Sequence, residues 1–229
     1  FLSQLADVLR SRVGEAQVAM RRQTAATLAK LRAAWRAEFA SEFADEHEPI
    51  NGYRLFAELW SVLDPDTSMV THESGAARDI QSVFYESTVP RSYLGWGQSS
   101  QLGFSLGLAM GAKIANPDKT VVNVMGDGAA GMTGMDWETA AREGIPILSV
   151  IKHDSIFSGY DRLMPIAMEK FGLTTLRGDY AGVAAALGCH AEKVSKLHEL
   201  RPALERALRA TREGQPAVVD VATAETRRL

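Results

Sequence analysis

Two apolar runs, each ending in polar residues, constrain the fold of this chain more than any other feature. The first run, Thr120–Met125, ends at Gly126-Asp127-Gly128, and the second, Ile147–Lys152, ends at His153-Asp154. A helix-like segment, Met135–Glu143, separates the two runs. Short apolar runs of this kind are typical of buried strands, and strands that alternate with helices form parallel sheets covered on both faces.

The same alternation extends over most of the chain. Asn51 is a residue type that caps helices and predicts a helix to about Leu63. Further helices are expected at 75–84, 101–115, 180–187 and 197–212, and strands at 68–71, 93–97 (with a glycine loop), 189–194 and 217–222. The stretch from Ser155 to Arg177 shows no periodicity and is expected to be irregular. The pattern predicts an α/β fold with three α/β/α layers and a mostly parallel sheet.

Three glycines, Gly103, Gly107 and Gly111, lie four residues apart in the helix predicted at 101–115. This spacing places them on one helix face, where the missing side chains permit close backbone packing. We interpret the last two as sites where the helix packs against the sheet, without a ligand.

The first 44 residues show apolar side chains at helical spacing, with an interruption near Gly14. We expect residues 1–45 to form a helical interdomain linker and residues 46–229 to form the α/β domain. The chain opens with Phe1 and lacks the pattern of a signal peptide, so we expect it to be the latter part of a longer polypeptide.

Charge and cysteine content exclude several classes of function. A net charge of −3 gives no reason to expect nucleic acid or an anionic membrane as a partner. No apolar run approaches the roughly 20 residues of a membrane-spanning helix. The single cysteine, Cys189, excludes an internal disulfide and cysteine-rich metal clusters. A reducing, cytoplasmic location is the expectation.

The acid in Gly126-Asp127-Gly128 is unusual for a phosphate-binding turn. Glycines at a strand end allow backbone N–H groups to approach a diphosphate, but a carboxylate between them repels it. A divalent cation held between the carboxylate and the phosphate removes the conflict. Asp127 therefore indicates a cofactor that consists of a metal ion and a diphosphate.

A dinucleotide-binding oxidoreductase is the main alternative. Gly126–Gly131 fits the pattern G-x-G-x-x-G, and Asp154 follows the next strand, where an acid can bind a ribose hydroxyl. Against this, Asp127 would face the pyrophosphate with nothing to neutralise it. Asp154 also lies 27 residues beyond Asp127, whereas the usual spacing is about 20.

An ordered set of short motifs resembles the diphosphate-binding domain of thiamine-diphosphate enzymes in the acetolactate synthase and 2-oxo acid decarboxylase group. Gly126-Asp127-Gly128 and His153-Asp154 occupy the places of the family's Gly-Asp-Gly and Asn-Asn motifs. The remaining matches are Gly75, Pro90-Arg91, Gly95–Gln101, Leu102-Gly103, Gly111-Ala112-Lys113, Asn116–Lys119, Glu138-Thr139-Ala140 and Ile145-Pro146. The resemblance covers roughly residues 46–225.

The resemblance implies a set of site residues. Asp127 and Asp154 would bind Mg²⁺ through their side chains, and Ile156 would bind it through its backbone carbonyl. Around the diphosphate, Gly126 belongs to the turn, and Gly128 and Ala129 would offer backbone N–H groups. Leu102 would hold the cofactor in its bent form and meet its pyrimidine ring through a backbone N–H, while the Ser100 carbonyl would accept a hydrogen bond from the aminopyrimidine.

Several residues depart from the family pattern. Asp154 stands where the family has a neutral Asn, which adds a negative charge and could favour Mn²⁺ or Ca²⁺, or leave a site that binds no cofactor. The segment Ser74–Arg78 lacks the histidine of many synthases, and Leu163 falls near an aromatic position of plant-type acetolactate synthases. His72 and His153 are candidates for substrate contact or proton transfer, and core or surface roles remain open for both.

The implied activity is that of a lyase or synthase that cleaves or forms carbon–carbon bonds of 2-oxo acids or related acyl donors. In this group a glutamate that activates the cofactor belongs to a separate pyrimidine-binding domain, and Glu73, Glu138 and Glu143 do not match its motif. We expect that domain to come from the same or a neighbouring chain, in a homodimer or homotetramer. A non-catalytic regulatory relative is the other alternative.

Overall fold

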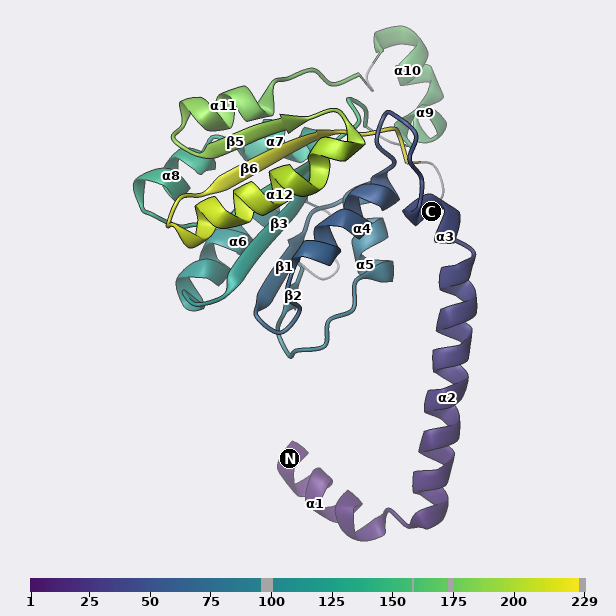
Figure 1. Ribbon diagram of the computed structural model, residues 1–229. Coiled ribbons are helices and arrows are strands. Elements are labelled where there is room, and N and C mark those ends of the chain that lie inside the picture. The colour runs from purple at the N-terminus through teal and green to yellow at the C-terminus, as the bar shows by residue number, and fades with distance from the viewer. Residues whose placement is uncertain (96–100, 158, 173–174, 227–229) are drawn as a thin grey trace. The chain divides into compact units, whose positions relative to one another are not determined.

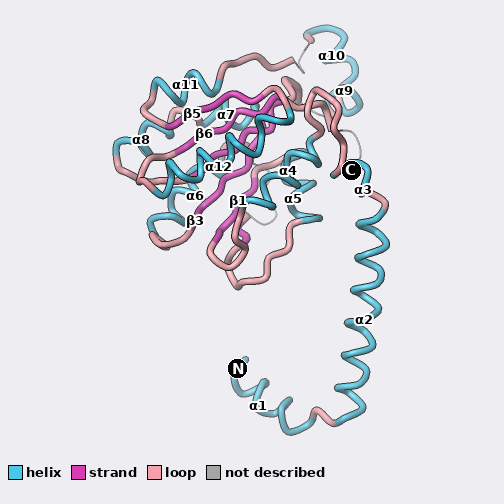
Figure 2. The backbone as a smooth tube through the Cα atoms, viewed as in Figure 1, coloured by secondary structure: helices cyan, strands magenta, loops and turns pink. Residues whose placement is uncertain are grey.

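The protein consists of two compact units, Phe1–Ser41 and Glu42–Leu229. The structure, a computed structural model, describes residues 1–95, 101–157, 159–172 and 175–226. The first unit contains α1 (Leu2–Arg12) and α2 (Glu15–Ala37), and the short helix α3 (Ala40–Phe43) crosses the boundary (Figure 2). The predicted interruption at Gly14 is confirmed, because Gly14 precedes α2 with an extended backbone. A linker role for this unit stays a prediction.

The second unit is built on six parallel strands in the order β2-β1-β3-β4-β6-β5 (Figure 1). The strands are β1 (Ser68–His72), β2 (Tyr93–Leu94), β3 (Thr120–Gly126), β4 (Leu148–His153), β5 (His190–Val194) and β6 (Ala217–Ala222). Helices cover both faces of this sheet, so the predicted three-layer α/β/α fold is confirmed.

One face carries α5 (Ala76–Phe84) and α12 (Leu197–Arg212), which pack on the sheet, and α4 (Gly52–Val62), which packs against both of these helices (Figure 1). The other face carries α6 (Phe104–Ala115), α7 (Asp127–Thr133), α8 (Asp136–Arg142) and α11 (Tyr180–Ala186). Strand β3 has apolar side chains on both faces of the sheet, so helices must bury both faces. Val121 and Met125 belong to the core under α6 and α8, and the intervening Val122 and Val124 are buried on the opposite face.

Two sequence-based predictions about local structure are wrong. The segment expected to be irregular contains two short helices, α9 (Tyr160–Leu163) and α10 (Pro165–Phe171). Gly107 and Gly111 do not pack on the sheet: both are exposed, and a Cβ on either would meet no atom within 4 Å. Gly103 does make a close approach, since a Cβ there would lie 2.4 Å from Thr133 Cγ2 and its φ is +89°.

The order of the strands fixes where a ligand can bind. From β1 the chain moves to one side of the sheet to form β2 and then returns to form β3 on the other side of β1. Such a reversal opens a crevice at the carboxyl ends of the strands, where ligands of open α/β sheets bind. The segments that follow β1, β3 and β4 meet at this crevice.

Candidate functional site

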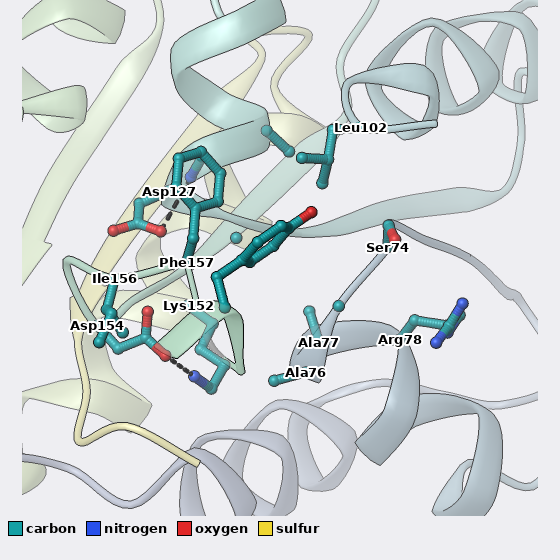
Figure 3. A pocket seen from close by; sticks show the side chains of 15 residues that line it. Ser74, Ala76, Ala77, Arg78, Leu102, Asp127, Lys152, Asp154, Ile156 and Phe157 are labelled. Carbon is teal, nitrogen blue, oxygen red and sulfur yellow. Dashed lines mark hydrogen bonds and ion pairs between the residues drawn. The ribbon is translucent and has the colours of Figure 1, made fainter. Parts of the chain in front are cut away.

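A pocket of about 350 Å³ lies at the carboxyl ends of β1, β3 and β4 (Figure 3). Three segments from distant parts of the sequence form most of its wall, and Leu102 and Tyr160 complete it. The lining residues of the three segments are Ser74–Arg78 after β1, Gly126–Ala129 after β3, and Lys152, Asp154, Ile156 and Phe157 at and after the end of β4.

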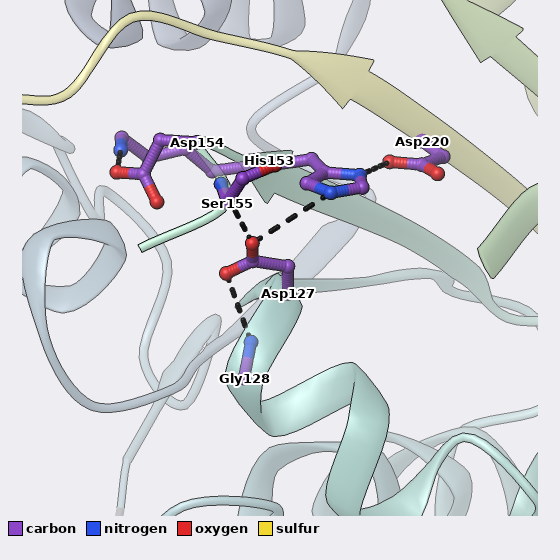
Figure 4. A network of polar contacts seen from close by, with 7 residues as sticks. Asp127, Gly128, His153, Asp154, Ser155 and Asp220 are labelled. Carbon is purple, nitrogen blue, oxygen red and sulfur yellow. Dashed lines mark hydrogen bonds and ion pairs between the residues drawn. The ribbon is translucent and has the colours of Figure 1, made fainter. Parts of the chain in front are cut away.

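Asp127 is buried at the first position of α7, directly after β3. Its Oδ1 accepts a hydrogen bond from the Gly128 N–H at 2.9 Å, and its Oδ2 accepts one from the Ser155 N–H at 2.8 Å (Figure 4). Burial raises the pKa of the Asp127 carboxyl, and the nearby charge of Asp154 raises it further. Two acids therefore lie close together in a site that contains backbone donors.

His153 connects this site to the neighbouring strand β6. Its Nδ1 lies 2.8 Å from Oδ1 of the fully buried Asp220, and its Nε2 lies 3.7 Å from Asp127 Oδ2 (Figure 4). The hydrogen bond with Asp220 raises the pKa of the His153 imidazole. This arrangement orients the His153 ring toward Asp127, and His153 is not among the residues that line the pocket.

Lys152 and Asp154 form an ion pair inside the pocket wall. Lys152 Nζ lies 2.6 Å from Asp154 Oδ2, and only 2% and 5% of the two side chains are exposed (Figure 3). The negative charge that Asp154 adds relative to a neutral amide is thus balanced by a cation two residues earlier, near the end of β4.

The structure brings most of the predicted site residues together. Seven of them line the one pocket: Leu102, Gly126, Asp127, Gly128, Ala129, Asp154 and Ile156. Ser100 lies outside the described residues. Leu163 is exposed and does not line the pocket. His72 is buried, with its ring stacked on Tyr93, and is likewise absent from the pocket lining.

Glu73 has a structural role that fits its exclusion from the candidate acids. It is fully buried and follows β1. Its Oε2 accepts hydrogen bonds from the Ser105 hydroxyl at 2.6 Å and the Ser105 N–H at 3.1 Å, at the start of α6. A carboxylate at a helix N-terminus satisfies free N–H groups there. Glu73 therefore holds the loop after β1 against α6.

Lys152, Arg78, Phe157 and Tyr160 line the pocket and were not identified as site residues from the sequence. For Lys152 a signal exists, because a cation at the end of an otherwise apolar buried strand needs an anionic partner. The other three lie in segments without a distinctive pattern. Their place in the pocket depends on how the loops after β1 and β4 converge.

The pocket fits a metal–diphosphate group in its chemistry. Among the residues that the structure describes, no three His, Cys, Asp or Glu side chains gather as a complete metal site. Two carboxylates, those of Asp127 and Asp154, line the pocket, and Mg²⁺ binds oxygen ligands and commonly takes the remaining ones from phosphate and water. Glycine at position 128 allows the Phe157 ring to lie close to the turn, because a Cβ at Gly128 would lie 2.7 Å from Phe157 Cε1.

The sequence from residue 74 to 221 matches the family described as thiamine pyrophosphate enzyme, C-terminal TPP binding domain. The chain belongs to the thiamine pyrophosphate enzyme family. It is 36% identical over 185 residues to the acetolactate synthase large subunit IlvG of Mycobacterium tuberculosis, covering 80% of this chain and 33% of the relative. It is 27% identical over 188 residues to 2-hydroxyacyl-CoA lyase 2 of Caenorhabditis elegans, covering 79% of this chain and 29% of the relative.

Among solved structures, the chain is similar to the thiamine diphosphate-dependent 4-hydroxybenzoylformate decarboxylase of Rhodococcus jostii RHA1. The TM-score is 0.67 at 25% sequence identity, with 76% of this chain and 33% of the other chain covered. The chain thus spans about a third of the length of these relatives, which are named as a synthase, a lyase and a decarboxylase. These matches do not favour the dinucleotide-binding and regulatory alternatives.

None of the helices in the described part of the chain combines the length and the apolar character needed to cross a membrane.

Proposed function

We propose that this domain binds the diphosphate end of thiamine diphosphate through Mg²⁺, as part of an enzyme that cleaves or forms carbon–carbon bonds of 2-oxo acids or related acyl donors. One observation carries the proposal. Asp127 and Asp154, from the ends of the neighbouring strands β3 and β4, line one pocket within the segment that matches the family. The names of the relatives, among them an acetolactate synthase and a 2-hydroxyacyl-CoA lyase, support the reaction class.

In this proposal Asp127, Asp154 and the Ile156 carbonyl hold Mg²⁺, and the N–H groups of Gly128 and Ala129 bind the diphosphate. The first turn of a helix leaves N–H groups without helical partners, which suits an anion; the Gly128 N–H, which donates to Asp127 Oδ1 in this structure, would turn to the diphosphate when the carboxylate binds the metal. The metal offsets the repulsion between the two carboxylates and the phosphates.

Leu102 and Ser100 act at the other end of the cofactor. Leu102 presents its side chain to the pocket from just before α6 and would support the bent form of the cofactor. We assign the Ser100 carbonyl to the aminopyrimidine. When bound, thiamine diphosphate supplies the nucleophilic carbon for carbon–carbon bond chemistry. This domain orients that group and keeps its charged end out of bulk water.

The domain alone does not complete an active site in this proposal. The activating glutamate belongs to a pyrimidine-binding domain of the same or a neighbouring chain, and we expect a cytoplasmic homodimer or homotetramer. Residues 1–45 would serve as the connection between domains.

Calorimetry on the full natural polypeptide tests the proposal. We expect thiamine diphosphate to bind only in the presence of Mg²⁺. Asp127→Ala should weaken this binding more than about 100-fold, beyond the usual effect of outer-shell partners of a metal. Asp136→Ala is the matched control, because Asp136 begins the neighbouring helix α8 and is exposed. Metal-independent binding of NAD(P)H, or unchanged binding in Asp127→Ala, would contradict the proposal.

A further inference from the structure

Lys152 occupies an unusual place for a lysine. It lies near the end of β4, between β3 and β6, and its side chain is 2% exposed. Its register partner on β3 is Gly126, the first residue of the turn that holds Asp127. A Cβ at Gly126 would meet no atom within 4 Å. The lysine thus lines the pocket directly beside the turn that is suited to a diphosphate.

The aliphatic part of the Lys152 side chain packs against the start of α4. A Cβ at Gly52, the first residue of that helix, would lie 2.9 Å from Lys152 Cε and 2.6 Å from Thr226 Oγ1. A larger residue at position 52 would force the lysine side chain or Thr226 to shift. This packing limits the positions that the ammonium group can take.

The ammonium group is incompletely bonded. An ammonium has three N–H donors, and among the described residues Asp154 Oδ2 is the only acceptor that it bonds. Buried cations without enough acceptors are costly. The side chain that carries the remaining N–H donors lines the pocket (Figure 3). A ligand with acceptor oxygens in this pocket would accept hydrogen bonds from these donors.

We propose that Lys152 is a cationic ligand of the cofactor's diphosphate, held in place by Asp154. This inference rests on the proposed function and adds to it a direct contact from the protein to the phosphate oxygens. In this proposal the Asp154 carboxylate contacts two cations: its Oδ2 holds the Lys152 ammonium, and the same carboxylate binds the metal of the proposed function. The acid that departs from the family pattern and the lysine form one unit.

A simpler role for Lys152 makes a different prediction. If the lysine only neutralises Asp154, it becomes dispensable once residue 154 is an amide. If it binds the diphosphate, its removal weakens binding even when residue 154 is neutral. Asparagine keeps the side-chain oxygen for the metal, so Asp154→Asn is the background in which the two roles separate.

The experiment compares Asp154→Asn with the double variant Lys152→Met, Asp154→Asn in the full natural polypeptide. Calorimetry at saturating Mg²⁺ measures the affinity for thiamine diphosphate and, separately, for inorganic pyrophosphate. We expect the double variant to bind both probes about 10- to 100-fold more weakly than Asp154→Asn and than wild type, as for loss of a hydrogen bond to a charged group. Thermal unfolding without ligand checks that the double variant, which has neither buried charge, is folded.

A matched control removes an ion pair of the same length at the surface. Lys196 Nζ lies 2.6 Å from Glu48 Oε2, and the two side chains are 53% and 36% exposed. Glu48→Gln with Lys196→Met should leave both affinities unchanged.

The outcomes separate this inference from the proposed function. Double-variant binding equal to that of Asp154→Asn overturns the role of Lys152 and leaves the proposed function standing. Another outcome is that wild type binds pyrophosphate but not thiamine diphosphate, and that the pyrophosphate binding is lost when Lys152 is replaced. That result supports Lys152 as a diphosphate ligand and contradicts the proposed function. Absence of binding of either probe to wild type overturns both.

Discussion

The phenyl ring of Phe157 lies so close to Gly128 that a Cβ on the glycine would come within 2.7 Å of Cε1. Gly128 belongs to the first turn of α7, and Phe157 follows β4. The contact therefore joins the segments after two neighbouring strands at the wall of the pocket. Glycine at this position allows the ring to cover the turn that contains Asp127.

Gly128→Ala should weaken the binding of thiamine diphosphate about tenfold or more, because the added methyl group forces the Phe157 ring to move within the pocket. The clash involves the outer edge of a side chain, so the melting temperature should change little by comparison. Titration calorimetry in the presence of Mg²⁺, with thermal unfolding alongside, measures both effects. Unchanged affinity would show that the Phe157 ring can move without cost to the site.

Gly111 provides a contrasting glycine. It lies on the outer side of α6, where a Cβ would meet no atom within 4 Å, and its φ is not positive. Alanine restricts the unfolded chain and favours the helix, so Gly111→Ala should increase the free energy of unfolding by about 0.5–1 kcal/mol. Urea unfolding of the full natural polypeptide measures the change. Destabilisation would show that this face of α6 packs closely against another part of the protein.

Much of the fold is predictable from the sequence because the periodic segments are long. Helix Leu197–Arg212 and strand Ala217–Ala222 have the predicted bounds, since amphipathic and apolar patterns of this length have few alternative structures. The segment after β4 is different. Helices α9 and α10 contain 4 and 7 residues, too few turns for a hydrophobic pattern to be distinguished from an irregular loop.

Local sequence patterns also predict only part of the side-chain arrangement in the site. The ordered motifs predict Asp127 and Asp154 as site residues through their resemblance to the family, and both acids line one pocket. Asp220 comes 67 residues after His153 in the sequence, and no local pattern predicts their hydrogen bond. The outward direction of Gly107 also depends on which side of α6 meets the sheet, which spacing along one helix does not determine.

Cys189 should be unreactive in the folded protein. Its side chain is buried in the core near Trp137, whose carbonyl oxygen lies 3.8 Å from Sγ. Burial raises the pKa of the thiol to about 11, and the thiolate is the reactive form. Iodoacetamide labelling at about pH 8 should modify Cys189 in urea and leave it largely unmodified in native buffer, relative to free cysteine. Equal labelling rates would show that the segment before β5 opens readily.

Asp45 should make the start of the second unit sensitive to acid. Asn51 caps α4 by accepting from the Tyr53 N–H, and its amide donates to Asp45 Oδ2 at 3.0 Å. This hydrogen bond, together with one from the His47 N–H, lowers the pKa of Asp45 from 3.8 to about 2. A folded-state pKa below the unfolded value contributes stability that is present above 3.8 and is lost as the pH falls from 3.8 through about 2.

Asp45→Asn isolates this contribution from the other acids. We expect wild type to be the more stable protein at about pH 5, and the difference in free energy of unfolding to shrink as the pH approaches 2. The effect should be small, because the Asp45 side chain is 26% exposed and solvent screens its interactions. Urea unfolding of both proteins across this pH range measures it. A difference that stays constant with pH would mean that the Asn51 amide does not prefer the ionised form of Asp45.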